Sequence, residues 1–404
     1  MTEQMNVPKL RFSEFNEALV RKTFEEVAEK IQDGTHFSPP LDEEGTCLYL
    51  TSKNIRNGFM LLDNISYISE LEHKKIYKRC DVKRGDVLLT KDGASTGNCC
   101  INTLDSEFSL LSSVAFIRAN ANHHNNFIYQ SIASQAGQKL IRGAISGQAI
   151  TRITLTKLRN FKFYFPTLPE QQKIASFLSK VDEKIGLLSE KKDKLTEYKR
   201  GVMQQLFNGK WHEQYGQLTF APPTLRFKAD DGSEFPDWEE KRYSDIFTTF
   251  RSGQGITSSN IKELGEYPVY GGNGLRGYTS KYTHDGFYFL IGRQGALCGN
   301  INRVTGKNYI SEHAIACKVD NDLGTEFYAQ RLQQLNLNRF SESSAQPGLS
   351  VNKLLRFKVL VPCESEQAKI ASFLLRLDEK VSITNSELEK AKEWKKGLLQ
   401  QMFV

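Results

Sequence analysis

The sequence predicts an α+β protein in which a mostly β domain followed by a long helix occurs twice. Two observations support this. The segment at 169–207 recurs at 365–403 with a constant offset of 196 residues, and the stretches before each copy are rich in short β-type runs. A duplicated architecture changes the meaning of every other motif, because each motif then belongs to one of two equivalent halves. We expect the parts to span residues 1–165, 166–209, 210–362 and 363–404.

The repeated segments are predicted to be long helices, because they lack internal proline and their apolar residues recur every seven positions. The positions expected to form their seam, and to dock partners, are Ile174, Phe177, Val181, Leu188, Leu195 and Val202 in the first copy and Ile370, Phe373, Leu377 and Leu398 in the second. Thr384 and Ala391 weaken the middle of the second row. A helix about 57 Å long, at ~1.5 Å per residue, exceeds one small domain. Pairing as a hairpin or coiled coil is favoured, and separate packing of each helix stays open.

The stretches before the helices are predicted to be curled, mostly β domains with long loops. Runs such as "VLLT", "SVAFIRA", "GFYFLIG" and "HAIACKV" are separated by clusters of Gly, Asn, Ser and Asp. Some helix is expected at 127–141 and 325–339, where apolar residues fall three and four apart. A short strand closed by proline, "FKFYFP" or "FKVLVP", precedes each long helix.

A glycine-rich turn is shared by the two domains. "KDGASTGN" at 91–98 and "RQGALCGN" at 293–300 each have a basic residue, one polar residue, Gly-Ala, two variable residues and Gly-Asn. Neither matches the phosphate loop of NTPases. We expect the glycines to shape both turns through positive φ, and Lys91 and Arg293 to meet an anion. Since the helices are alike and the domains mostly differ, the helices are predicted to serve one kind of partner twice and the domains two different ligands.

Catalytic motifs are weak throughout. "GNGLRG" matches a dinucleotide fingerprint, but turn and strand are expected after it instead of a helix. "PDWEEK" separates its carboxylates by one residue, which suits a turn before a strand better than a nuclease metal centre. "NANHHNNF" is expected to be a solvated loop. The seven cysteines have no zinc-ligand spacing, which favours reduced thiols and a cytoplasmic protein.

Several strings together resemble one family. "EQQKIASFL" and "EQAKIASFL" in the helices, with "DGTHFSPP" (33–40), "YLTSKNIRNG" (49–58), "RGDVLLTKDGASTGN" (84–98) and "YPVYGGNGLRGY" (267–278), are similar to the DNA-specificity (S) subunits of type I restriction-modification systems. The resemblance covers nearly the whole chain. The net charge of +7 agrees with a polyanionic partner but is a weak hint by itself.

The resemblance implies two target-recognition domains, each reading one half of a split, asymmetric DNA target, separated by two long antiparallel helices that form a coiled-coil spacer. It implies double-stranded DNA, two modification (methyltransferase) subunits and ATP-dependent restriction subunits as partners. S-adenosylmethionine, ATP and Mg²⁺ would belong to those partners, so this chain would be non-catalytic and hold no cofactor or metal. A non-catalytic scaffold that binds protein, or an enzyme with degenerate motifs, remains an alternative at this point.

If the domains bind DNA, the polar loops must supply the contacts, because arginine and lysine pair with guanine, and asparagine and glutamine with adenine. The candidates in the first half are His36, Lys91, Ser95, Thr96, Asn98, Gln148, Thr151 and Arg152. Those in the second half are Arg251, Gln254, Asn273, Arg276, Arg293, Gln294 and Gln346.

Overall fold

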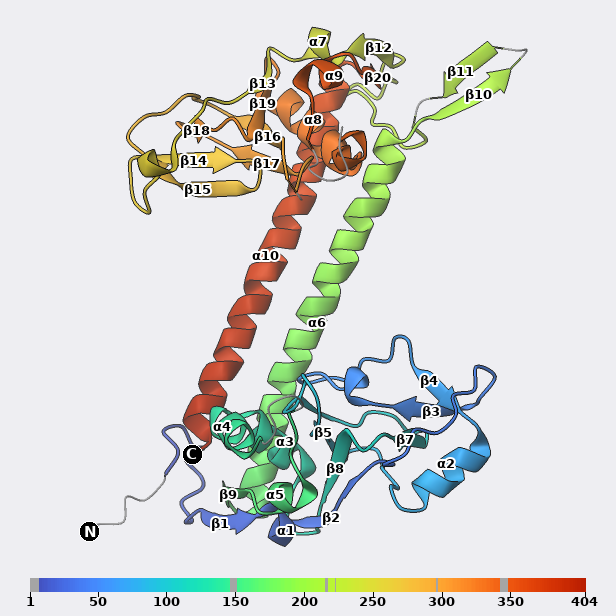
Figure 1. Ribbon diagram of the computed structural model, residues 1–404, viewed down its shortest axis with the longest axis vertical. Coiled ribbons are helices and arrows are strands. Elements are labelled where there is room, and N and C mark those ends of the chain that lie inside the picture. The colour runs from blue at the N-terminus through green and yellow to red at the C-terminus, as the bar shows by residue number, and fades with distance from the viewer. Residues whose placement is uncertain (1–6, 146–150, 215–216, 222, 296, 342–347) are drawn as a thin grey trace. The chain divides into compact units, whose positions relative to one another are not determined.

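The computed structural model describes residues 7–145, 151–214, 217–221, 223–295, 297–341 and 348–404. It divides into two compact units (Figure 1). The first unit contains residues 1–190 and 385–404, and the second contains residues 191–384. Both long helices, α6 (Leu168–Phe207) and α10 (Glu364–Met402), contribute one part to each unit.

The first unit is built on two small sheets. A four-stranded antiparallel sheet has the order β2 (Ala28–Asp33), β8 (Val114–Ala119), β5 (Val87–Thr90) and β6 (Cys99–Ile101). A three-stranded sheet has the order β4 (Ser66–Ile68), β3 (Cys47–Leu50) and β7 (Phe108–Leu110), and its β3–β7 pair is parallel. The strands β1 (Val20–Thr23) and β9 (Lys162–Phe165) pair separately. The helices are α1 (Phe24–Val27), α2 (Glu70–Tyr77), α3 (Asn125–Ala133), α4 (Gln135–Ala144), α5 (Leu155–Arg159) and the 3-10 turn η1 (Ser52–Asn54).

The second unit repeats this topology. Its four-stranded sheet has the order β13 (Thr249–Ser252), β19 (Ala314–Lys318), β16 (Tyr288–Gly292) and β17 (Ile301–Val304). Its three-stranded sheet has the order β15 (Gly274–Thr279), β14 (Tyr267–Gly271) and β18 (Tyr309–Ile310), again with a parallel pair, β14–β18. The separate pairs are β12 (Glu239–Arg242) with β20 (Lys358–Val361), and β10 (Lys210–Gln214) with β11 (Gln217–Ala221). The helices are α7 (Tyr243–Ile246), α8 (Asp322–Gln334), α9 (Val351–Leu355) and the 3-10 turns η2 (Ser258–Asn260) and η3 (Leu337–Phe340). The predicted tandem α+β fold is confirmed.

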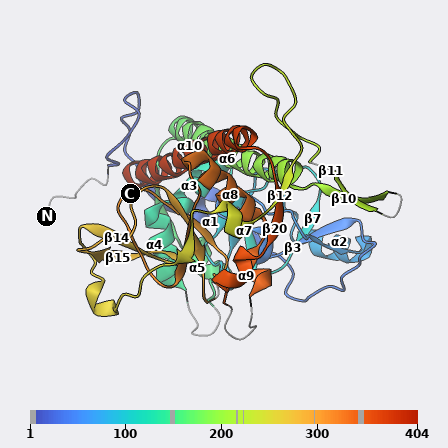
Figure 2. The same ribbon diagram turned by 90° about the horizontal axis from the view of Figure 1, so that it is seen from above.

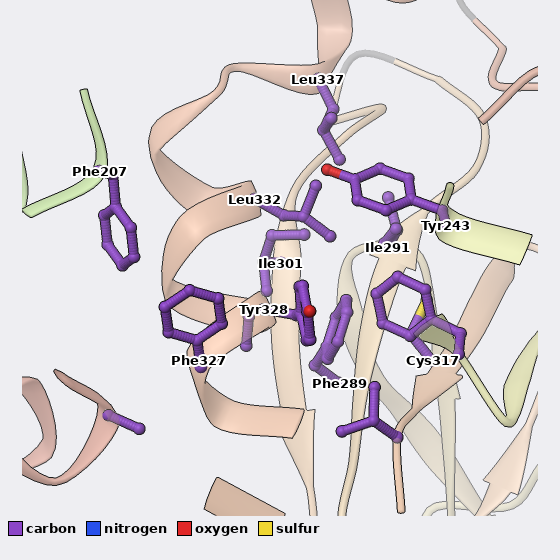
Figure 3. Close-up of a cluster of buried hydrophobic side chains, with 14 of the residues drawn as sticks. Phe207, Tyr243, Phe289, Ile291, Ile301, Cys317, Phe327, Tyr328, Leu332 and Leu337 are labelled. Carbon is purple, nitrogen blue, oxygen red and sulfur yellow. The ribbon is translucent and has the colours of Figure 1, made fainter. Parts of the chain in front are cut away.

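The central strands are buried on both faces, which explains their continuous apolar runs. Phe289 and Ile291 of β16 belong to the large core of the second unit, and Leu290 between them belongs to a smaller core on the other face of the sheet. This alternation follows from the two-residue period of a strand. Figure 3 shows the larger core, where Phe207 of α6 packs beside Phe327 of α8, with 5.5 Å between the ring centres, and α8 in turn lies against the sheet. The sheet is therefore fastened to the long helices by hydrophobic packing.

The long helices pair in both units. In the first unit, Ile174 and Val181 of α6 share a hydrophobic core with Leu398 near the end of α10. In the second unit, Val202 near the end of α6 shares a core with Ile370 early in α10. In each unit, an early part of one helix meets a late part of the other, so the helices run antiparallel.

The seven-residue row of α10 stays buried at the two positions where the sequence suggested weakness. Thr384 is 2% exposed and Ala391 is 8% exposed. Within the second unit, α8 lies beside the first turns of α10 in both views (Figures 1 and 2). No helix in the described ranges has the length and apolar character that crossing a bilayer requires.

Candidate nucleic-acid interface

Two of the predicted loops of the first unit meet at one end of the four-stranded sheet. β2 ends at Asp33, β5 ends one residue before Lys91, and both strands flank β8. The connection from β7 to β8 crosses the same end. Lys91 N donates to Ser113 O at 2.9 Å, and Thr35 N donates to Leu110 O at 2.8 Å. The sheet order thus brings the loops at 33–36 and 90–98, which lie more than fifty residues apart in the chain, against the same connection.

The second unit builds the same junction from different side chains. β13 ends at Ser252, and β16 ends one residue before Arg293. Arg293 N donates to His313 O at 2.9 Å, and Gln254 N donates to Ile310 O at 2.9 Å. These are the counterparts of the two bonds in the first unit, so Lys91 corresponds to Arg293 and Asp33 corresponds to Ser252.

A glycine is required on the loop after the edge strand in both units. A Cβ on Gly34 would lie 1.9 Å from Leu110 O, and a Cβ on Gly253 would lie 2.2 Å from Ile310 O. Both are impossible approaches for a side chain, which explains the "DGT" and "SGQ" strings at equivalent places. The backbone therefore occupies the space that a side chain at either glycine would need.

The two glycine-rich turns have the same shape, as predicted. Their four glycines have positive φ: Gly93 (95°), Gly97 (100°), Gly295 (84°) and Gly299 (86°). Gly97 N donates to Thr90 O at 2.9 Å and Gly299 N donates to Gly292 O at 2.7 Å, which closes each turn at the same point.

The basic residue at the head of the first turn is buried in an ion cluster. The Lys91 side chain is 1% exposed, and its Nζ lies 3.4 Å from Asp33 Oδ2 and 3.1 Å from Asp92 Oδ2. Asp33 is in turn 3.5 Å from Arg79 Nη2, and Asp92 is 3.5 Å from Arg152 Nε. The ammonium of Lys91 is engaged inside the domain, whereas the side chains of Arg79 and Arg152 are half exposed.

The head of the second turn lacks these carboxylates. Ser252 replaces the first aspartate and Gln294 replaces the second, and Gln294 Oε1 lies 3.2 Å from His313 Nδ1. Within the described ranges, the half-buried Arg293 side chain has no hydrogen bond or ion pair. Equivalent turns therefore hold a lysine that is ion-paired with two aspartates in one unit, and in the other an arginine that has no ion pair with any residue of the described ranges.

The hairpin "GGNGLRGY" reaches the same junction in the second unit. A Cβ on Gly272 would lie 2.7 Å from His313 O and 3.0 Å from Gly292 Cα, so the hairpin turn packs against the chain beside Arg293. Asn273 next to it is exposed. Arg276 on β15 is also exposed, and the aliphatic part of its side chain lies beside Gly271 of the hairpin. As predicted, strands and not a helix follow this glycine string, because the chain continues through β15 to β16.

Several residues that were predicted to contact DNA already make hydrogen bonds within the first unit. The hydroxyls of Thr96 and Thr151 are 3.2 Å apart and both donate to Gly93 O, at 2.6 and 2.5 Å. Asn98 Nδ2 donates weakly to Ile55 O at 3.4 Å, and Ser95 is half buried. The exposed candidates are His36, Arg152, Arg251, Gln254, Asn273, Arg276 and Gln294. Gln148 and Gln346 lie outside the described residues, and DNA contact by any of these residues stays a prediction.

Three residues at these junctions were missed by sequence reasoning: Arg79, Ser113 and His313. Arg79 Nη2 donates to Gly34 O at 2.5 Å, and Ser113 and His313 accept from the heads of the two turns. Ser113 and His313 stand directly before the strands "VAFIRA" and "AIACKV", which the sequence did identify. Their equivalent positions in the two halves of the repeat were the sequence signal that could have identified them.

The paired histidines differ from the expectation of a solvated loop. His123 and His124 are half buried, and the ring of His123 packs edge-on against Phe165 at 5.4 Å. Burial, with a smaller effect from Lys22, lowers the pKa of His123 to about 4, and burial also lowers the pKa of His124. The strand that precedes α6 packs against His123, and the local string does not encode this contact.

No group of three or more His, Cys, Asp or Glu side chains that could hold a metal ion occurs among the described residues. In "PDWEEK" the two glutamates begin β12, where Glu240 pairs with Lys358 at 2.7 Å. The cysteines are free thiols, and Cys80, Cys99, Cys100, Cys298 and Cys317 are buried, as expected for small apolar residues.

The comparisons with known proteins agree with the repeat. The family model described as the type I restriction modification DNA specificity domain matches residues 16–197 and again residues 236–393. The chain belongs to this family. Within the family it is 41% identical over 169 residues to the specificity subunit of type I restriction enzyme EcoprrI of Escherichia coli, a match covering 41% of this chain and 40% of that relative.

A second specificity subunit, of type I restriction enzyme MjaVIII from Methanocaldococcus jannaschii, is 23% identical over 399 residues, covering 89% of this chain and 86% of that one. Among solved structures, the type I restriction-modification S subunit from M. genitalium matches 98% of this chain and 99% of its own length, with a TM-score of 0.67 and 20% identity. At that identity, the likeness supports the fold.

Proposed function

We propose that this chain is the DNA-specificity subunit of a type I restriction-modification complex, with each unit binding one half of a split target. One observation carries the proposal. The specificity-domain family model matches both halves, and in both halves the predicted DNA-contacting loops gather at the same end of the same sheet. The alternative of a protein-binding scaffold has no comparable observation in its favour.

The different side chains at the two junctions give a physical reason for two different half-sites. The first junction presents hydroxyls and Arg152 around a neutralised lysine. The second presents Arg293 with Gln294 and Asn273 nearby. Arginine pairs with guanine O6 and N7, and amide side chains pair with adenine. We therefore expect the two units to read different bases, guanine opposite Arg293 being the most specific expectation.

The partners follow from the same proposal. Two methyltransferase subunits would dock on the long helices, and ATP-dependent restriction subunits would join them. S-adenosylmethionine, ATP and Mg²⁺ would be bound by those partners, and this chain would position them on DNA without catalysing a reaction. We place the complex in the cytoplasm, where DNA is accessible and thiols stay reduced.

Mapping methylated adenines across the host genome, with and without this chain, tests the function. We expect a split motif whose methylation disappears when the chain is absent. A second arm uses Arg293→Ala, which should weaken binding to the mapped site by about 1–3 kcal/mol if the guanidinium makes a bidentate base contact. A methylation pattern that does not depend on the chain would reject the proposal. Unchanged affinity at fixed salt would remove only Arg293.

The spacer role has its own test. Inserting one heptad into each long helix should lengthen the gap between the half-sites and leave their sequences unchanged, because a heptad preserves the apolar row. Altered half-sites with an unaltered gap would contradict a role for the helices in setting the spacing.

A further inference from the structure

A polar bridge outside the recognition loops joins each globular domain to both long helices. In the first unit, Gln130 of α3 donates from Nε2 to Asp182 Oδ2 of α6 at 2.9 Å. The other oxygen of this carboxylate lies 2.5 Å from Nζ of Lys395 on α10. The two oxygens of one aspartate thus bind a side chain of the domain helix α3 and a side chain of the other long helix, α10.

The second unit contains the same bridge with the roles of the long helices exchanged. Gln330 of α8 donates to Asp378 Oδ2 of α10 at 2.7 Å, and Lys199 of α6 lies 2.5 Å from Asp378 Oδ1. Asp182 and Asp378, like Lys199 and Lys395, are separated by the 196-residue offset of the repeat. Each helix therefore supplies an aspartate to one unit and a lysine to the other.

The bridge is largely shielded from water. Gln130 and Gln330 are 0% exposed, and the lysine side chains are 14% exposed in both units. Nζ of Lys395 also lies 5.5 Å from the ring centre of the buried Tyr129. If the helices moved out of register, a buried amide and a nearly buried ammonium would lose their partner, which is costly in an apolar surrounding.

The apolar seam alone does not define the register to this degree. Leucine, isoleucine and valine recur every seven residues, so a shift along the seam still places apolar residues against apolar residues. A single polar pair in such a seam discriminates between registers because only one register satisfies it. The bridge adds a third element to that pair, since its glutamine comes from the globular domain.

In the second unit the bridge continues to the strand beside the recognition turn. Gln330 Nε2 also donates to Glu326 Oε1 at 2.6 Å, and Arg303 holds Glu326 through Nε–Oε2 at 2.7 Å and Nη2–Oε1 at 2.8 Å. Arg303 lies on β17, which directly follows the turn headed by Arg293. Hydrogen bonds and ion pairs therefore connect the strand that follows this turn with both long helices.

We propose that Asp182 and Asp378 are positioning residues that fix where each recognition domain sits along the helix pair, and through this the gap accepted between the two half-sites. The inference rests on the proposed function. One turn of α-helix rises about 5.4 Å, and one base pair adds about 3.4 Å of DNA length. A slip of one helical turn is thus larger than the difference between neighbouring gap lengths.

The test is a selection of bound sites from a random duplex library, using the full-length chain with its methyltransferase subunits. Wild type should select two half-sites with one gap length. Asp182→Ala should select the same half-sites while its preference for that gap over gaps one base pair longer or shorter falls by roughly tenfold, the scale of coupling between contacting residues. Lys392→Ala serves as the control. It removes an exposed ion pair between Lys392 and Glu389, which both lie on α10.

A charge exchange separates positioning from folding. In the double variant Asp182→Lys with Lys395→Asp, the amide of Gln130 can turn over and present Oε1, which is buried without a hydrogen-bond partner. We expect this variant to regain the single gap. The inference is overturned if Asp182→Ala keeps the wild-type gap preference, or if the folded exchange variant stays as broad as Asp182→Ala. Failure of wild type to select half-sites would instead overturn the proposed function.

Discussion

Replacing the head residue of each glycine-rich turn by methionine should reduce the folding stability of the first unit and the DNA binding of the second. Lys91→Met removes an ammonium that is 1% exposed and leaves Asp33, with 3% of its side chain exposed, without its most buried partner. Arg293→Met removes a half-buried guanidinium that has no ion pair among the described residues. The two positions are equivalent in the repeat, so each variant controls for the other.

The magnitude follows from what remains around Asp33. Removing one partner of a buried ion pair costs about 3–5 kcal/mol. Asp33 keeps Arg79 at 3.5 Å and His36 at 3.4 Å, both on half-exposed side chains. We therefore expect Lys91→Met to destabilise the first unit by about 2–4 kcal/mol, below the full penalty because weak partners remain. Arg293→Met should change the stability of the second unit by less than about 0.5 kcal/mol.

Hydrogen exchange followed by mass spectrometry can measure both units in one chain, because it reports opening free energies peptide by peptide. Peptides covering 87–101 should exchange about 30- to 1,000-fold faster in Lys91→Met, since 1.4 kcal/mol corresponds to a factor of ten. Peptides covering 288–304 should be unchanged in Arg293→Met. The double variant Asp33→Asn with Lys91→Met should recover part of the loss, because the most buried carboxylate of the cluster is then replaced by a neutral amide.

Binding to the mapped DNA site completes the contrast. Arg293→Met should weaken binding by about 1–3 kcal/mol while stability is kept. Less than about threefold faster exchange in Lys91→Met, or an equal loss of protection in Arg293→Met, would refute the view that the buried carboxylates of the first unit distinguish the two turns.

Three further outcomes are expected. The pKa of His123 is lowered to about 4 in the fold, from 6.5 for a free histidine, so the fold favours its neutral form. Stability should therefore fall as pH decreases from about 6.5 towards 4, because the unfolded chain binds a proton that the folded chain does not. His123→Phe should flatten that part of a profile of melting temperature against pH. A thiol reagent should label the half-exposed Cys47 and Cys363 in the native chain and all seven cysteines in denaturant, as mass spectrometry can count; native labelling of the five buried thiols would contradict the described packing. Gly34→Ala should strongly destabilise the first unit because its Cβ would meet a backbone carbonyl, whereas Gly186→Ala, in an open part of α6, should raise stability by about 0.5–1 kcal/mol in the same exchange measurement.

Much of the architecture could be predicted because it depends on local chemistry. The seven-residue apolar period of the long helices, the absence of internal proline and the proline after β9 and β20 define elements whose residues lie close in sequence. The turn glycines were predictable for the same reason, since positive φ is a property of one residue. The family resemblance rested on these strings and is confirmed by the match of both halves.

The expectations that were wrong or incomplete depend on distant packing. His123 and His124 looked solvated because their own loop is polar, yet both are half buried, and His123 packs against the strand before α6. From the sequence, Lys91 and Arg293 were equal candidates for DNA contact, because they head equivalent turns. Whether such a cation is neutralised is decided by β2, whose last residue is more than fifty positions away.

The sequence by itself determined the duplication, the helices and the shape of the turns, because each is encoded by spacing or by the backbone freedom of single residues. Tertiary structure alone decided the sheet order with its parallel pairs, the ion cluster around Lys91, and the glutamine–aspartate–lysine bridge in each unit. These features depend on which charges and amides come within hydrogen-bonding distance after burial, where an unpaired group is costly. That distance is set by the packing of the whole unit and leaves no periodic mark in the chain.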